Sequence, residues 1–120
     1  TDVHTAEAEI PKMAFSHAEA GQWLKENVPA GTVLMARDSE VALYAGMPCI
    51  AFPNAEWRQV LAYARSHGAH FLVVDEWTIK NIRPQLKMLL DTDHSPTDLR
   101  FLHVAGKGSG RAVYIYQILS

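Results

Sequence analysis

Residues 70–76 of the chain read HFLVVDE, an apolar run that ends abruptly at two carboxylates. Apolar residues at consecutive positions are typical of a strand that is buried on both faces of a sheet. Such a strand lies between two layers of helices, so this stretch predicts an α/β fold. The pair Asp75–Glu76 marks the point where the buried strand reaches water. Three roles are possible for this pair: helix capping, contact with a ligand, or acid–base chemistry.

Helix and strand signals alternate on both sides of this stretch. The segment SHAE, Ser16–Glu19, has the form of a capping box, and Pro29–Gly31 ends the helix behind it. Asn54 is expected to open the most regular helix, which stops at Gly68. The expected elements are, in chain order, a helix over 16–28, strands and helices alternating over 32–36, 38–46, 48–52, 54–68, 70–75 and 79–90, and two strands over 99–105 and 112–119.

Strands that alternate with helices are expected to pair in parallel, with helices on both faces of the sheet. The element order predicts a three-layer α/β/α sandwich around a mostly parallel, Rossmann-like sheet of five strands in the order 2-1-3-5-4. The last two strands are separated only by a glycine-rich segment and are expected to form an antiparallel hairpin. Residues 1–15 are interpreted as a lead-in and residues 16–120 as a single α/β domain.

The composition excludes several classes of function. The chain has 120 residues, 48% of them apolar, and a formal net charge of −2. Its 11 Lys and Arg residues are scattered, so the basic stripe of a nucleic-acid-binding protein is missing, as is a basic patch for a membrane surface. No apolar run approaches the length of about 18 residues that a transmembrane helix needs. The single cysteine, Cys49, cannot form an intrachain disulfide and is interpreted as a small core residue.

Two motifs that suggest ligand sites are better explained by structure. The segment GKGSG, Gly106–Gly110, has the composition of a phosphate loop, but a phosphate loop leads directly into a helix. Strand residues follow here, so a hairpin turn is expected. His67 and His70 lie three residues apart with Gly68 interrupting the helix between them, which argues against a metal pair. His67 is interpreted as a cation near a helix C-terminus, and no metal or cofactor is predicted.

Polar residues follow the strands at the edge where open α/β sheets bind ligands. The candidate ligand or acceptor contacts at this edge are Arg37, Asn54, Asp75, Glu76 and Trp77. Arg37 and Asp75 would form an ion pair, an anion site or a sugar-binding rim on which Trp77 supplies a stacking face.

Helix capping is the competing interpretation of the same edge, because Asp38, Asn54 and Asp75 all stand where helices are expected to begin. Capping is the preferred interpretation of Asp75, ligand contact the second and catalysis the last. No catalytic residue is predicted, since no partnered His or Lys can be named for either carboxylate.

Several segments together resemble a known family. Residues 23–29 fit WL-x-EN-x-P, residues 33–37 fit V-x-M-x-R, and residues 44–48 fit YAG-x-P. VLAYARSHGA over 60–69 leads into FLVVD, and residues 91–103 fit D-x-x-HSPTDLRFLH. Across residues 18–118 the chain resembles the C-terminal soluble domain of polytopic membrane glycosyltransferases of the protein-O-mannosyltransferase and aminoarabinose-transferase-like group.

The resemblance implies a parent protein with many transmembrane helices and an extracytoplasmic, periplasmic location for this domain. Such proteins transfer a sugar from a polyprenyl-phosphate donor to a protein, lipid or glycan acceptor. Their catalytic carboxylate lies in a loop near the first membrane helices, and no position of this chain matches it. The implied function is a structural or acceptor-recognising role. Its partners would be the transmembrane part of the same polypeptide and a glycan, lipid-linked sugar or protein acceptor, with no membrane insertion by this segment.

Two alternatives stay open. The first is a free-standing small-ligand-binding or regulatory module with a Rossmann-like fold, although the dinucleotide glycine fingerprint is missing after the first strand. The second is an enzyme that uses Asp75 or Glu76 as a general base. The chain begins at Thr1 rather than at methionine, which favours a piece of a longer protein.

Overall fold

A computed structural model describes residues 12–120 of the chain. The elements are α2 (Lys12–Asn27), β1 (Leu34–Ala36), α3 (Glu40–Ala45), β2 (Cys49–Ala51), α4 (Trp57–Ser66), β3 (Phe71–Asp75), α5 (Glu76–Ile82), the 3₁₀ helix η1 (Pro84–Leu90), β4 (Leu99–Ala105) and β5 (Val113–Ile118).

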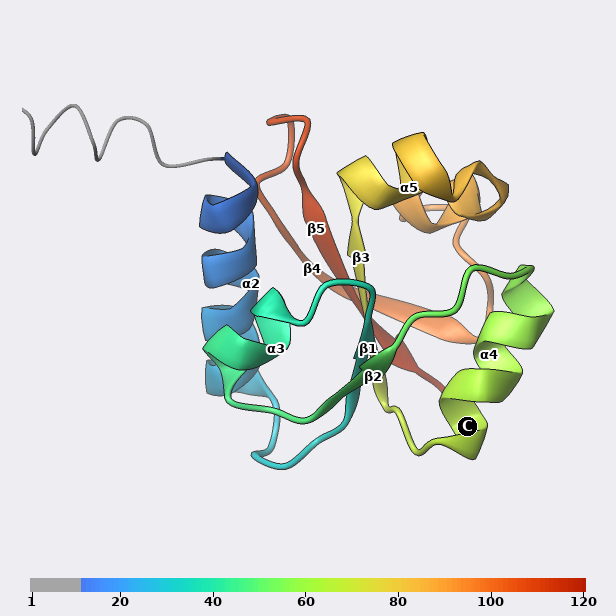
Figure 1. Cartoon of the computed structure of the whole chain (residues 1–120), viewed down its shortest axis with the longest axis horizontal. Helices are drawn as coiled ribbons and strands as arrows, with labels where there is room; N and C mark the ends of the chain where they lie inside the picture. Colours follow the sequence, from blue (N-terminus) through green and yellow to red (C-terminus); the bar gives the residue numbers. More distant parts are fainter. Residues whose placement is uncertain (1–11) are drawn as a thin grey trace, which may run out of the picture.

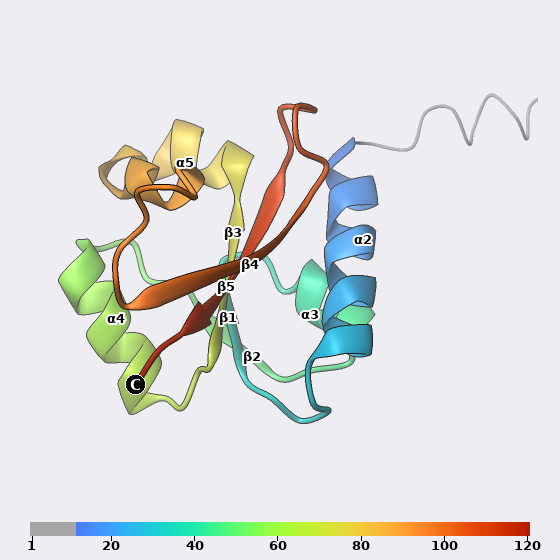
Figure 2. The ribbon, with the colours of Figure 1, turned by 180° about the vertical axis from the view of Figure 1, so that it is seen from behind.

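The chain folds into three layers with the sheet in the middle. Helices α2 and α3 cover one face of the sheet, and α4, α5 and η1 cover the other (Figure 1). The view from behind shows the same division, with the β4–β5 hairpin in front (Figure 2). The predicted α/β/α layering is therefore confirmed.

The five strands lie in the predicted order, β2-β1-β3-β5-β4. Strand β1 pairs in parallel with β2 and β3, whereas β5 runs antiparallel to both β3 and β4. The sheet is thus mixed, and the prediction of a mostly parallel sheet is wrong. The β4–β5 hairpin is the reason why the sheet is mixed. A hairpin strand must run opposite to its partner, and β5 lies between β3 and β4, so it reverses two of the four pairings.

The two edges of the sheet are short or irregular. At one edge, β2 has only 3 residues. At the other, β4 pairs with β5 through a register shift between Phe101 and His103. The turn between β4 and β5 uses glycines with positive φ at positions 106, 108 and 110, which confirms the predicted hairpin turn.

Strand β3 is the centre of the hydrophobic interior. Leu72 and Val74 pack into the core under α4, α5 and η1, and Val73 packs into the core under α2 and α3. All three side chains are buried. The consecutive apolar pattern of FLVVD is therefore explained, because alternate side chains enter two different cores.

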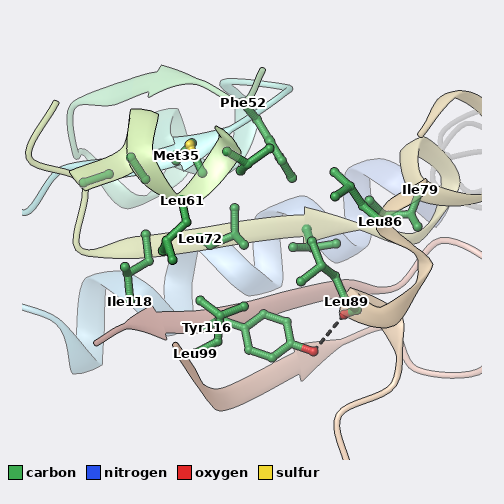
Figure 3. Close-up of a cluster of buried hydrophobic side chains, with 14 residues drawn as sticks. Met35, Phe52, Leu61, Leu72, Ile79, Leu86, Leu89, Leu99, Tyr116 and Ile118 are labelled. Atoms are coloured by element: carbon green, nitrogen blue, oxygen red, sulfur yellow. Dashed lines mark hydrogen bonds between the residues drawn. The ribbon is translucent and has the colours of Figure 1, made fainter. Parts of the chain in front are cut away.

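Tyr116 links the sheet to η1 inside the larger core (Figure 3). Its ring is fully buried beside Leu99 and Leu89, and its hydroxyl donates a hydrogen bond of 2.7 Å to the Leu89 carbonyl. Burial raises the pKa of Tyr116 to about 12, so the hydroxyl stays a donor throughout the neutral range.

Three predicted helix boundaries are wrong. Helix α2 begins at Lys12 rather than at Ser16, and Ser16 lies buried inside it, against Gly106 of the hairpin turn. Helix α4 begins after Glu56 rather than at Asn54, because Glu56 and Gln59 form the capping box. The helix expected over 79–90 is two helices. The first begins at Glu76, and Pro84 starts the second. Of the predicted lead-in over 1–15, residues 1–11 lie outside the described part of the chain.

Helices α2 and α3 approach each other closely at Gly21. A Cβ on Gly21 would overlap Tyr44 Cβ and would lie 2.9 Å from the Val41 carbonyl oxygen. Because backbone and Cβ atoms line this contact, the neighbours cannot rotate away. Glycine is therefore required at this position by packing and not by an unusual φ angle.

Replacing Gly21 with alanine should destabilise the chain by about 1–3 kcal/mol, since overpacking pushes α2 away from α3. In an exposed helix the same change would stabilise by about 1 kcal/mol, so the sign alone separates the two cases. Urea unfolding measures the difference, with Gln22→Ala on the exposed side of α2 as the control. A stability equal to or above that of the wild type would contradict this packing.

Candidate functional site

The carboxyl ends of β1, β2 and β3 bring the predicted contact residues toward one edge of the sheet. Arg37 follows β1 and Asn54 follows β2. Asp75 ends β3, and Glu76 and Trp77 open α5 directly behind it.

Asp75 is the N-cap of α5. Its Oδ1 accepts a hydrogen bond of 2.8 Å from the Thr78 amide, and its Oδ2 accepts one of 2.7 Å from the Thr78 hydroxyl. Both carboxylate oxygens are therefore engaged within one helical turn. The preferred interpretation of this residue, helix capping, is confirmed.

Glu76 joins the start of α5 to the start of β5 through hydrogen bonds. Its backbone amide donates to the Ala112 carbonyl at 2.8 Å, and its Oε1 accepts from the Ala112 amide at 3.1 Å. Its Oε2 accepts from Lys80 Nζ at 2.6 Å, and this bond is the main cause of a lowered Glu76 pKa. A carboxylate with a lowered pKa and bound oxygens is poorly suited to act as a general base.

Two arginines from different parts of the chain lie near the ring of Trp77. The guanidinium carbons of Arg37 and Arg111 lie 5.9 and 5.8 Å from the centre of its ring. Arg37 also donates a long hydrogen bond of 3.4 Å to the buried Thr78 hydroxyl. We call Arg37, Trp77, Thr78 and Arg111 the Trp77 surface. Apart from the Arg37 Nη1–H that donates to Thr78, a cation–π contact leaves the guanidinium N–H groups of Arg37 and Arg111 free to donate to an anion.

A third arginine, Arg83, lies near enough to Arg37 and Asp75 to feel their charges. Arg83 is only 9% exposed and donates hydrogen bonds from Nη1 to the carbonyls of Phe52 and Pro53, after β2. Burial lowers the pKa of Arg83, the nearby charge of Arg37 lowers it further, and Asp75 opposes both. Three arginines therefore lie at this end of the sheet, together with the carboxylates of Asp75 and Glu76. Arg37 and Asp75 both influence Arg83, but no ion pair joins those two within residues 12–120.

Asn54 does not join the other four predicted residues. Its side-chain oxygen accepts a hydrogen bond of 2.7 Å from Gln85 at the start of η1. It therefore neither caps α4 nor contacts the Trp77 surface through any hydrogen bond found in the described chain. Asp38, the remaining predicted cap, accepts a hydrogen bond of 2.9 Å from the Glu40 amide at the start of α3.

Sequence reasoning missed Thr78, Arg83 and Arg111. Thr78 and Arg83 carry no motif for their long-range contacts, because Arg37 lies 41 positions from Thr78 and Pro53 lies 30 positions from Arg83. Arg111 could not be found from the strand order alone. Its segment lies beside the end of β3 because β5 runs antiparallel to β3, so that Asp75 pairs with Val113.

The two remaining sequence observations have structural explanations. His67 caps the end of α4, where its ring stacks on Tyr63 and its Nδ1 lies 2.9 Å from the Tyr63 carbonyl oxygen. Cys49 is partly buried against the core under α2 and α3, and burial raises its pKa. None of the helices in residues 12–120 is long and apolar enough to cross a bilayer.

Comparison of the chain with protein-family models, curated proteins and solved structures finds no match.

Replacing Asp75 with alanine should lower the free energy of unfolding by about 1–2 kcal/mol, because α5 loses its cap. Asp75→Asn should keep most of the stability, since asparagine caps helices about as well. Urea unfolding of both variants measures the effect, with Asp93→Ala in an exposed loop as the control. Equal losses in the alanine and asparagine variants would contradict a capping role.

The bond between Glu76 and Lys80 predicts a pH-dependent contribution to stability. Because the folded pKa of Glu76 is below its ordinary value of 4.5, the contribution is complete above that pH. It is lost as the pH falls through the folded pKa. The difference in unfolding free energy between wild type and Glu76→Gln should therefore shrink as the pH falls from 7 to 3. A constant difference over that range would show that the carboxylate charge does not matter.

Proposed function

We propose that this chain is a non-catalytic, extracytoplasmic domain of a membrane glycosyltransferase that uses a polyprenyl-phosphate sugar donor. In this proposal the domain is attached to the transmembrane part of the same polypeptide and recognises the acceptor, a glycan or lipid-linked sugar, through the Trp77 surface.

The observation that carries the proposal is the presence of two arginines, Arg37 and Arg111, beside the Trp77 ring. An indole face packs well against the apolar face of a sugar ring. Guanidinium groups bind phosphate through paired hydrogen bonds. A sugar that carries a phosphate, as a lipid-linked sugar does, combines the two chemistries.

A non-catalytic role agrees with the state of the two carboxylates. Asp75 uses both oxygens in the α5 cap, and Glu76 is held by Lys80 and Ala112. Neither arrangement resembles a general base beside a reactive group. The residues of this edge are better suited to holding a ligand than to transferring one of its groups.

Binding of a soluble sugar phosphate, as a probe for a phosphate-carrying acceptor sugar, tests the contact. Titration followed by NMR should shift the indole N–H signal of Trp77 and leave those of Trp23 and Trp57 unchanged. Trp77→Ala and Arg37→Ala should each weaken binding about fivefold or more. Arg58→Ala, which removes an exposed arginine on α4, should bind as the wild type does. No shift of the Trp77 signal at millimolar ligand would contradict acceptor recognition.

Fractionation of native cells tests the parent protein independently. An antibody raised against this chain should detect a band far above 13.4 kDa in the detergent-extracted membrane fraction. A membrane band without ligand binding would support a structural role in the same parent. A band of 13.4 kDa outside the membrane fraction would reject the parent and favour the free-standing ligand-binding module.

A further inference from the structure

Three side chains with metal-binding atoms meet where α2 passes the junction of β1 and α3. They are His17 of α2, Asp38 of the junction and Glu40 at the first position of α3. One ligand atom from each lies within 4.8 Å of the other two. Within residues 12–120 this is the one group of three such side chains at that spacing.

His17 is the side chain that makes this group unusual. It is 1% exposed, and its Nδ1 has no hydrogen-bond partner. Buried polar atoms are nearly always paired, and leaving one unpaired costs free energy of the order of 1–3 kcal/mol. Glu40 Oε1 lies 3.6 Å from this atom, and a ligand atom of His17 lies within 4.8 Å of a carboxylate oxygen of Asp38.

That distance fits a shared ion better than a direct contact. At 3.6 Å the two atoms are too far apart for a hydrogen bond. Two ligands of one tetrahedral zinc ion, each about 2.0–2.1 Å from the metal, lie about 3.3 Å apart. A small movement of the Glu40 side chain, which is 39% exposed, is enough to reach that separation.

The surrounding structure holds the three residues in place. His17 lies one turn before Gly21 on α2, and Gly21 permits the close approach to α3. The Asp38 carboxylate is oriented by the hydrogen bond that its Oδ1 accepts from the Glu40 amide. Outer contacts of this kind orient metal ligands in known sites.

We infer that His17, Asp38 and Glu40 form a binding site for a divalent transition-metal ion of the zinc type. One imidazole and two carboxylates suit Zn²⁺, and the imidazole disfavours Mg²⁺ and Ca²⁺. The bound ion would join α2 to the β1–α3 junction and neutralise two acidic side chains. The site uses none of the residues of the Trp77 surface, so it is independent of the proposed function.

The competing explanation is a simple ion pair between a protonated His17 and Glu40. Carboxylates at the start of a helix are also favourable without any ligand. An ion pair needs only a proton, whereas a metal site needs all three side chains. The role of Asp38 therefore separates the two explanations.

Zinc titration of the chelator-treated chain tests the site by calorimetry. We expect saturable binding of one Zn²⁺ per chain and a shift of the His17 Nδ1 signal in long-range ¹H–¹⁵N NMR spectra. Asp38→Asn and Glu40→Gln should each weaken binding about tenfold or more. Both keep the shape of the side chain, and asparagine can still accept the Glu40 amide. Mg²⁺ at the same concentration should leave the His17 signal unchanged.

Two variants serve as controls. His94→Gln removes an exposed histidine that contacts Asp91, and Glu26→Gln removes a carboxylate from the exposed side of α2. Both should bind Zn²⁺ as the wild type does. The inference is overturned if Zn²⁺ fails to bind at millimolar concentration, if Asp38→Asn binds as tightly as the wild type, or if His94→Gln removes the binding.

Discussion

The burial of β3 on both faces is the constraint on which the rest of the fold depends. Leu72 and Val74 require a helical layer on one side of the sheet, and Val73 requires another on the opposite side. The strand can become polar only at its end, where the chain leaves both cores. Asp75 is the first residue to do so, and a carboxylate at that point meets the amides of the next helix. The Asp75 cap and the polar residues at this end of the sheet therefore have the same origin.

The direction of β5 determines which residues lie at the carboxyl end of β3. If β5 had paired in parallel with β3, its first residues would lie at the opposite end of the sheet. Because it runs antiparallel, its start lies beside the end of β3, and Ala112 meets Glu76. Arg111 consequently lies beside Trp77 although the two residues are 34 positions apart in the sequence. The mixed pairing, which departs from the expected sheet, is thus the feature that assembles the Trp77 surface.

The features that sequence predicts well here depend on local chemistry. Gly46 and Gly68 end α3 and α4 in the left-handed region, and the consecutive apolar residues of β3 identify the central strand. The Asp75 cap also follows from its position alone. Features that depend on tertiary packing were not accessible. The SHAE segment has the form of a capping box, yet Ser16 is buried against the hairpin turn because the helix continues upstream. No periodicity shows that Arg83 binds carbonyls after β2 or that His17 lies beside Glu40.

The register shift in β4 has a consequence for how the molecule behaves at high concentration. A long, flat strand at the edge of a sheet offers unpaired amides and carbonyls on which a second molecule can add its own strand. An irregularity such as that between Phe101 and His103 bends the strand and increases its twist, so the backbone groups no longer form a straight row. At the opposite edge, β2 is too short to hold another strand firmly. Neither side of the sheet is therefore a good template for fibrous growth.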